Sequence, residues 1–376
     1  SLHSRVIEFE ENSRVLMTVD SRLFTAREEI LFEPTGDGTR LRYIAEFDFP
    51  TPLAAFNRLF PVAMHRVGKR AMAGLKQALE DDFEAPQASG LLAAADRLIV
   101  PGLWRFTKLG FRESRRRWNA LSAYQGDRHA LITGATSGLG LAAARQLAEL
   151  GARVTVVGRS DSKAQALVAE LQAQTGNENI AAEIADLSLM SDVHALCDRL
   201  LAAGEPIDML INNAGALFNP RQQTSEGFEK SFALLLLSPY VLTERLHSLL
   251  CKADSPRVVN ELSGGMYTQR IEVDDLQSQR GNYSGSVAYA RAKRGLMILT
   301  EEWAEDWSTD GIAVNAMHPG WADTPGVETA LPGFHRLTKP LLRTPEEGAD
   351  TAVWLAASTE AAQVSGKFWL DREQHP

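Results

Sequence analysis

Apolar residues follow three different patterns along the chain, and these patterns divide it into three parts. The first part, residues 1–82, alternates short apolar runs with polar positions, which predicts strands. Gly36-Asp37-Gly38 separates the last two runs and predicts a hairpin turn. Apolar residues then recur at steps of three or four from Phe56 to Leu79, which predicts one long helix kinked at Pro61. The predicted strands are 6–9, 15–19, 25–32 and 41–49.

The third part, residues 127–376, alternates apolar strand-like runs with helical stretches. This order predicts an α/β domain with a doubly wound parallel sheet. Ligands bind such sheets outside the carboxyl ends of the strands, so we expect the functional residues in the loops that follow them. The runs are HALITG, RVTVVG, IAAEIAD, DMLINNAG, RVVNELSG, IAVNAMHPG and KFWLD.

Residues 83–126 connect these two parts, and within them residues 91–117 mix aromatic and basic residues around Trp104 and Phe111. One interpretation is an amphipathic helix that lies on a membrane surface and gives the protein a peripheral membrane contact. The other interpretation is a helix that packs on the next domain and leaves a basic face in water. The sequence favours the second interpretation, since interfacial helices are uncommon.

Composition narrows the class of protein. A chain of 376 residues with 44% hydrophobic and 23% charged residues suits two or three globular domains. The net charge of −9 offers no basic face, so we expect no nucleic-acid partner. Two cysteines, Cys197 and Cys251, exclude a disulfide framework, and neither a secretory start nor a membrane-spanning run is present, so we expect a cytoplasmic protein. We expect no metal.

A glycine-rich loop follows the first strand of the third part and precedes a helix. Glycines let the backbone turn tightly and approach a pyrophosphate, and the helix N-terminus favours its negative charge. This context predicts a dinucleotide site. The candidate cofactor-binding residues are Gly134, Thr136, Ser137, Gly138, Leu139 and Gly140.

The end of the second strand indicates which dinucleotide binds. An acidic residue there would accept hydrogen bonds from the adenosine ribose and favour NAD, but the strand ends in Gly158 and Arg159. Arg159 can instead meet a 2′-phosphate with charge-assisted bonds, which predicts NADP(H). Asp186 and Leu187 end the third strand, where we expect them beside the adenine.

Tyr289 and Lys293 lie four residues apart and so share one face of a predicted helix. A free tyrosine has a pKa near 10, and we expect the neighbouring ammonium to lower it toward the working range of an acid-base group. Ser263 ends the fifth strand, where its hydroxyl can donate to a carbonyl oxygen that gains negative charge. Pro319, Gly320 and Thr324 follow the sixth strand and are candidates to hold a nicotinamide carboxamide.

Together these motifs resemble the short-chain dehydrogenase/reductase family in its non-extended branch, with a Ser263–Tyr289 spacing like that of retinol-dehydrogenase-like members. The resemblance covers about 245 residues and adds Asn213, Ala214 and Gly215 to the expected cofactor site. It implies a Rossmann fold, with Tyr289 as the acid, Ser263 as the carbonyl binder, and Lys293 as the pKa modifier and ribose anchor. Many members are dimers or tetramers, so a homo-oligomer is also implied, although a fused domain can block the usual interfaces.

One position departs from the family pattern. The family usually has an asparagine in the helix after the Asn213 strand, where it supports a water-linked proton relay, and this sequence has Leu235 there. Without this asparagine, the supply of protons to Lys293 is in doubt, and so is the turnover rate that depends on it.

Residues 1–82 resemble the C-terminal part of a START-like, helix-grip domain of the SRPBCC group, which includes polyketide cyclases and lipid-binding proteins. The likeness rests on Thr39 to Tyr43 and on the long predicted helix, so we expect a partial α+β domain that begins inside the usual pattern. A small α+β domain that only packs on the third part is the alternative.

The leading hypothesis is an NADP(H)-dependent enzyme that reduces an apolar ketone or aldehyde, with Tyr289 as proton donor. A sensor or scaffold that binds NADPH with little turnover is the first alternative, motivated by Leu235. A lipid carrier led by the first domain is the second.

Overall fold

The structure, a computed structural model, describes residues 3–10, 14–20, 25–35, 38–48, 105–119, 121, 124–330, 335–336 and 338–375. The chain forms two compact units, residues 1–99 and residues 100–376. The helix expected from Phe56 to Leu79 lies outside the described residues.

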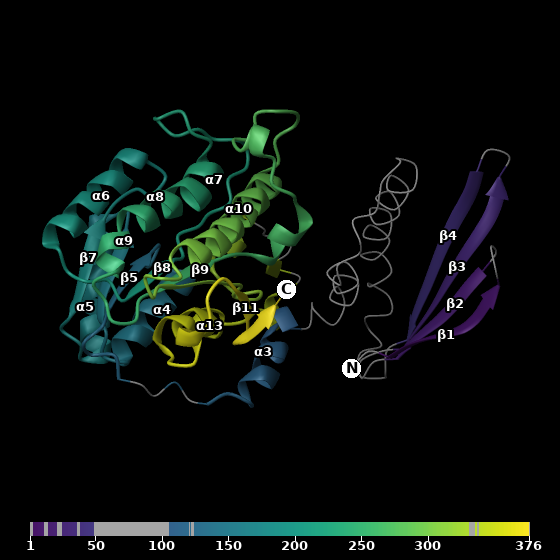
Figure 1. The fold of residues 1–376 in the computed structure, drawn as a ribbon, viewed down its shortest axis with the longest axis horizontal. Coiled ribbons are helices and arrows are strands. Elements are labelled where there is room, and N and C mark those ends of the chain that lie inside the picture. The colour runs from purple at the N-terminus through teal and green to yellow at the C-terminus, as the bar shows by residue number, and fades with distance from the viewer. Residues whose placement is uncertain are drawn as a thin grey trace. The chain divides into compact units, whose positions relative to one another are not determined.

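The first unit contains four antiparallel strands in the order β1-β2-β3-β4 (Figure 1). The predicted strands are confirmed, and each is longer than the apolar run that indicated it. Thr35 pairs with Gly38, so β3 and β4 form the hairpin expected around Gly36-Asp37-Gly38. The strands are β1 (His3–Glu10), β2 (Arg14–Asp20), β3 (Thr25–Thr35) and β4 (Gly38–Asp48).

The second unit is built on an eight-stranded sheet with the order β12-β11-β10-β9-β8-β5-β6-β7. Seven strands are parallel and coincide with the seven predicted runs, which confirms the doubly wound α/β sheet. The edge strand β12 pairs antiparallel with β11 and was not predicted, because its three residues Glu373–His375 carry no apolar pattern. The parallel strands are β5 (His129–Thr133), β6 (Arg153–Gly158), β7 (Ile180–Ile184), β8 (Met209–Asn212), β9 (Arg257–Glu261), β10 (Ala313–Met317) and β11 (Phe368–Leu370).

Helices cover both faces of this sheet, and each face has its own buried core. On one face lie α4 (Gly138–Glu149), α5 (Asp161–Thr175) and α13 (Pro345–Ala357). On the other lie α6 (Met190–Ala203), α8 (Ser238–Arg245) and α10 (Gly285–Asp306). The short elements are α7 (Lys230–Phe232), a π-helical turn (Ala233–Leu237), α9 (His247–Leu250), α11 (Pro325–Ala330) and 3-10 turns at Gly264–Thr268, Val273–Asp275, Lys339–Leu341 and Ala361–Gln363.

The described residues of the connector, 105–119, 121 and 124–126, belong to the second unit. Thr107 caps helix α3 (Lys108–Arg115), which buries Gly110, Phe111 and Ser114. Basic side chains of the segment pair with acids of the same unit, Arg112 with Glu347 and Arg117 with Glu373. Residues 105–119 therefore have the packed arrangement, and contact of residues 91–117 with a membrane stays a prediction.

Candidate active site

The glycine-rich loop joins β5 to α4 and lies beside the end of β8. Gly134 has a φ of +64°, and a β-carbon there would come within 2.7 Å of the Ala214 Cα. The Thr133 hydroxyl accepts hydrogen bonds from the backbone N–H groups of Asn213 and Ala214, both at 3.0 Å. The Asn213 side-chain amide donates back to the Thr133 carbonyl oxygen at 2.7 Å. Two of the predicted cofactor-binding segments are thus locked together.

The first turn of α4 has the features of an anion site. Ser137 precedes the helix without a side-chain capping bond, and the first turn contains no acidic residue. A β-carbon on Gly140 would come within 2.6 Å of the Gly134 carbonyl oxygen, so only glycine allows the loop to lie this close to the helix. Free N–H groups at a helix start attract phosphate. The donor set fits the pyrophosphate of a dinucleotide.

The loop after β10 reaches the same region. The position of a β-carbon on Gly138 lies 3.4 Å from Thr324 Cγ2, so Thr324 packs against the glycine-rich loop. Gly320 has a φ of +74°, and a β-carbon there would meet the Arg343 side chain at 2.3 Å. The expected residue Thr324 therefore adjoins the dinucleotide loop, although 184 residues separate it from Gly140 in sequence, and Gly320 lies against Arg343.

The residues expected around the adenosine follow β6 and β7. Arg159 is exposed after the end of β6, and Thr136 packs against Gly158, whose β-carbon would meet Thr136 Cγ2 at 2.6 Å. The Asp186 carboxylate accepts hydrogen bonds from the Ser188 backbone at 2.9 Å and hydroxyl at 2.7 Å. Leu187 is buried and lines a pocket that extends to Lys293.

The three candidate catalytic residues come from β9 and α10. Ser263 follows β9, and its hydroxyl accepts a hydrogen bond from the Gly265 backbone at 3.3 Å. Burial, followed by the negative charge of Glu261, raises the pKa of Tyr289 to about 12, while hydrogen bonding with the Ser263 side chain lowers it. The Ser263 side chain therefore lies near enough to the Tyr289 hydroxyl to affect its ionisation.

The expectation that Lys293 lowers the pKa of Tyr289 is wrong in this structure. Lys293 Nζ lies 5.9 Å from the centre of the Tyr289 ring and donates a hydrogen bond to the Glu261 carbonyl oxygen at 2.5 Å. Burial lowers the pKa of Lys293 itself, and the Glu261 charge partly raises it again. Among the causes that change the pKa of Tyr289, burial comes first and the Glu261 charge second, and Lys293 is not one of them.

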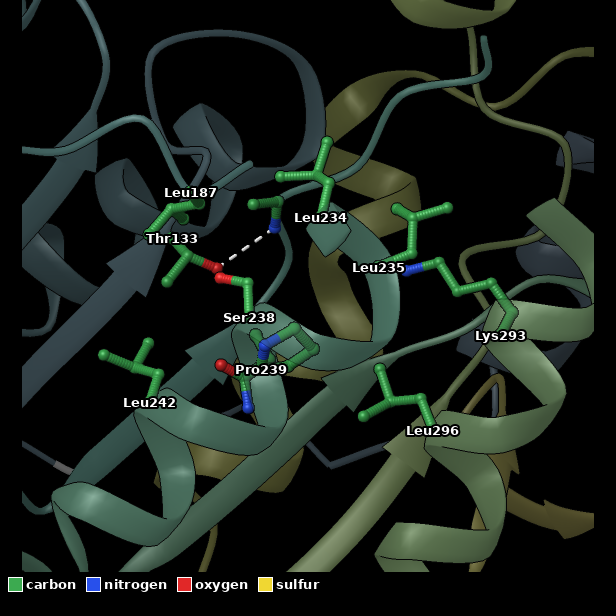
Figure 2. A pocket seen from close by; sticks show the side chains of 11 residues that line it. Thr133, Leu187, Leu234, Leu235, Ser238, Pro239, Leu242, Lys293 and Leu296 are labelled. Atoms are coloured by element: carbon green, nitrogen blue, oxygen red, sulfur yellow. Dashed lines mark hydrogen bonds between the residues drawn. The ribbon is translucent and has the colours of Figure 1, made fainter. Parts of the chain in front are cut away.

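Leu235 occupies the position where the family pattern has asparagine, and it lies in the π-helical turn between α7 and α8. Its side chain is 1% exposed and lines the same pocket as Lys293 (Figure 2). A β-carbon on Gly215 would contact both Leu235 Cδ2, at 3.5 Å, and Lys293 Nζ, at 3.9 Å. The wall that faces the lysine on this side is therefore apolar.

Arg343 joins the connector, the loop after β10 and the C-terminal strands. Its side chain is 1% exposed and forms a two-point ion pair with Asp371, at 2.6 and 2.9 Å. It also donates to the carbonyl oxygens of Pro319, Phe106 and Arg105. The backbone N–H of Trp321 donates to the Phe106 carbonyl oxygen at 2.7 Å. The connector therefore helps to hold the loop that contains Pro319 and Gly320.

Truncation should separate the connector from the first unit. We expect deletion of residues 1–99 to preserve NADPH affinity, because the second unit begins at Val100. Deletion of residues 1–120 should weaken NADPH binding by at least about tenfold and lower the melting temperature, because Phe106 and buried Phe111 are lost. Cofactor fluorescence titration and thermal unfolding of both deletions measure this. Equal behaviour of the two deletions would contradict the role of the connector.

Sequence reasoning missed Glu261 and Arg343, which belong to no motif. An acidic residue within the apolar run RVVNELSG was the available signal for Glu261. No local signal marked Arg343, because the hydrogen-bond partners of its side chain lie 24 or more residues away. Away from the cleft, His247, Cys251 and Asp310 each place one ligating atom within 4.8 Å of the others, and His247 already pairs with Asp310 at 2.9 Å.

Comparisons with known proteins agree with this geometry. Residues 128–332 match the family model described as short chain dehydrogenase, and residues 1–80 match the one described as polyketide cyclase / dehydrase and lipid transport. Dehydrogenase/reductase SDR family member 12 of Bos taurus is 40% identical over 289 residues, covering 76% of this chain and 90% of that protein. Retinol dehydrogenase 14 of Mus musculus is 32% identical over 305 residues, covering 76% and 90%.

Among solved structures, the Pseudomonas aeruginosa RhlG/NADP active-site complex matches with a TM-score of 0.54 and 26% identity, covering 67% of this chain and 96% of that one. The chain belongs to the short-chain dehydrogenase/reductase family of oxidoreductases, and its second unit has the Rossmann-like fold of that family. Searching the described residues for helices of the length and apolarity that a bilayer crossing requires identified none.

Proposed function

We propose that this protein uses NADP(H) to reduce the carbonyl group of an apolar ketone or aldehyde to an alcohol. One observation supports this proposal above the others: the Ser263 side chain lies near enough to the Tyr289 hydroxyl to lower its pKa, and Lys293 is buried on the same helix as Tyr289. Ser263 follows β9, and parallel sheets bind ligands outside the carboxyl ends of their strands.

The cofactor assignment rests on the fit of the loops to a phosphorylated dinucleotide. The uncapped start of α4 suits the pyrophosphate, and Thr324 and Gly215 border the adjoining space. Exposed Arg159 suits a 2′-phosphate. When bound, the reduced cofactor supplies the hydride.

We assign the other chemical roles in carbonyl reduction to three side chains. Ser263 would hold the carbonyl oxygen as negative charge develops on it, and Tyr289 would donate its hydroxyl proton to that oxygen. Lys293 is fixed by its bond to the Glu261 carbonyl oxygen and would orient the cofactor. With a pKa raised to about 12, Tyr289 keeps its proton at neutral pH, which favours reduction over oxidation.

The apolar character of the substrate is proposed from the segment between Ser263 and Tyr289. Within it, Tyr267, Val273 and Leu276 are exposed large apolar side chains. Exposed apolar groups beside a site suit an apolar ligand. The similarity to a protein named for retinol supports the same class of substrate.

The test is NADPH oxidation, followed by absorbance, with a panel of apolar and polar ketones, aldehydes and quinones. Faster oxidation with the apolar carbonyl compounds is expected, with Tyr289→Phe as the control variant. Tight NADPH binding without carbonyl-dependent oxidation would favour the sensor or scaffold alternative. Lipid that co-purifies with the first unit alone would favour the lipid carrier.

Arg159→Ala should weaken NADPH binding by about 10- to 100-fold and leave NADH binding unchanged, because charge-assisted hydrogen bonds contribute about 1.5–3 kcal/mol. Arg153→Ala is the matched control, since Arg153 begins the strand that Arg159 follows and carries the same charge. Fluorescence titration of each variant gives the dissociation constants for NADPH and NADH, which are compared with those of the wild type. An equal loss of NADPH and NADH binding would refute the 2′-phosphate role.

A further inference from the structure

His318 directly follows β10, and its imidazole ring is buried between two loops of the candidate active site. The residue is 5% exposed, and its backbone N–H donates a hydrogen bond to the Trp369 carbonyl oxygen on β11 at 2.9 Å. Phe106 of the connector packs on the ring, with 4.7 Å between the two ring centres. The imidazole therefore has a fixed place in the second unit.

One edge of the ring shapes the turn that follows it. The Gly320 backbone N–H donates a hydrogen bond to His318 Nδ1 at 3.0 Å. This bond closes a short loop around Pro319, at the end of which Gly320 has a φ of +74°. Arg343 holds the Pro319 carbonyl oxygen of the same turn, at 3.3 Å, whereas His318 holds its N–H group. Pro319 and Gly320 are the residues that we expect to hold the nicotinamide carboxamide.

The hydrogen bond also assigns the protonation state of the ring. Because Nδ1 accepts a backbone N–H, the ring is neutral and its proton lies on Nε2. A protonated imidazole has donors on both nitrogens and could not accept this bond. The surroundings agree, since burial, followed by the charges of Arg343 and His375, lowers the pKa of His318 to about 3. His318 is thus a hydrogen-bond acceptor for Gly320 at neutral pH.

The opposite edge of the ring lies against the turn that follows Ser263. A β-carbon on Gly264 would come within 2.8 Å of His318 Nε2 and 3.2 Å of its Cδ2. The ring therefore fills the space that a side chain at position 264 would need. Gly264 is bonded to Ser263, the expected carbonyl binder. One imidazole thus touches the turn after Ser263 and shapes the turn at Pro319 and Gly320.

We propose that His318 is a positioning residue that holds the Pro319–Gly320 turn in the shape that receives the nicotinamide and sets its spacing from Ser263. It acts through Gly320 and Gly264 and not on the reacting atoms. The proposal rests on the proposed function, because it concerns the cofactor half of the same site. Reacting atoms must lie about 3–3.5 Å apart for hydride transfer, so the spacing of these two turns bears on the reaction.

The first test changes the acceptor at position 318. His318→Leu removes it, whereas His318→Asn keeps a side-chain oxygen that can accept the N–H group two residues later. Both variants leave space beside Phe106, so both should have a lower melting temperature than the wild type. We expect only His318→Leu to weaken NADPH binding, by about five- to tenfold, which corresponds to one neutral hydrogen bond.

Isothermal titration calorimetry with NADPH and with 2′,5′-ADP separates positioning from general damage. The second ligand has the adenosine and the 2′-phosphate but no nicotinamide, so His318→Leu should bind it as the wild type does. If His318→Leu loses affinity for both ligands equally, or if His318→Asn loses as much NADPH affinity as His318→Leu, the proposal is overturned. If His318→Leu does not fold, His318→Gln replaces it, because the longer side chain carries its oxygen past the Nδ1 position.

A second pair of variants tests the contact with the turn after Ser263. Gly264→Ala should displace the ring and weaken NADPH binding by about the same factor as His318→Leu, again without affecting 2′,5′-ADP. Gly265→Ala is the comparison, because a β-carbon there would meet Ser263 Oγ at 3.6 Å and Ala290 Cβ at 4.0 Å, which are ordinary contacts. Its NADPH affinity should equal that of the wild type. Equal NADPH affinity in Gly264→Ala and Gly265→Ala would refute the proposal that His318 spaces the two turns.

Binding and turnover together distinguish this proposal from the proposed function. If wild-type protein binds NADPH but reduces no carbonyl compound, the proposed function fails, and the measured affinities still decide the role of His318. If folded His318→Leu binds NADPH as tightly as the wild type, the role of His318 fails and the proposed function stands. Wild-type protein that binds no NADPH would overturn both.

Discussion

Tyr289→Phe should lower kcat for carbonyl reduction by about 10²- to 10⁴-fold and leave the NADPH dissociation constant nearly unchanged. Phenylalanine keeps the ring among its neighbours but removes the hydroxyl whose pKa the Ser263 side chain lowers. General acid catalysis is lost, whereas the glycine-rich loop that would bind the cofactor is untouched. Steady-state kinetics with a carbonyl substrate and fluorescence titration with NADPH measure the two quantities.

Tyr240→Phe is the matched control for this variant. Tyr240 lies on α8, is 42% exposed and stacks on Trp303, so its hydroxyl should be dispensable. We expect kcat of this control within about twofold of wild type, since exposed sites tolerate substitution. Wild-type activity in Tyr289→Phe, or a loss of NADPH binding that accounts for its defect, would contradict the acid role.

Arg343→Met should lower the free energy of unfolding by about 3–5 kcal/mol, because it leaves Asp371 buried without its cation. Asp371 is 0% exposed, and burial already raises its pKa, while Arg343 lowers it. Without Arg343 the folded-state pKa of Asp371 rises further above its unfolded value. The loss of stability is then full at high pH and diminishes as the pH falls and the carboxyl becomes protonated. Denaturant unfolding at several pH values measures it.

Two controls separate charge from general damage. Arg343→Met/Asp371→Asn removes both charges, keeps a side chain that suits the positive φ of position 371, and should regain much of the lost stability. Arg199→Met removes an arginine from a more exposed pair with Glu183 and should change stability by less than about 1 kcal/mol. An Arg343→Met deficit that does not vary with pH would contradict this account.

The cofactor site follows closely from local sequence. Glycines placed between a strand and a helix have a backbone reason to be there, and Gly134 and Gly138 do adopt positive φ angles. Tyr289 and Lys293 share a helix, so their spacing alone predicts that they lie near each other. The seven parallel strands could be predicted equally well from the sequence, because buried strands in such sheets are continuous apolar runs.

The charges that act on the catalytic candidates could not be predicted from local sequence. The predicted effect of Lys293 on Tyr289 was wrong, because Glu261 and burial dominate the tyrosine pKa in the folded chain. Likewise, Arg343 contacts Phe106, 237 residues earlier, and nothing near Arg343 in the sequence indicates that partner.

The sequence by itself therefore determined the order of the elements, the dinucleotide loop and the identity of the acid-base candidates, since backbone preferences and helix spacing are local. Only the tertiary structure decided which charges face Tyr289 and which loops Arg343 holds together. Electrostatic energies depend on distance through space and on burial, and neither quantity is set until distant segments pack against one another.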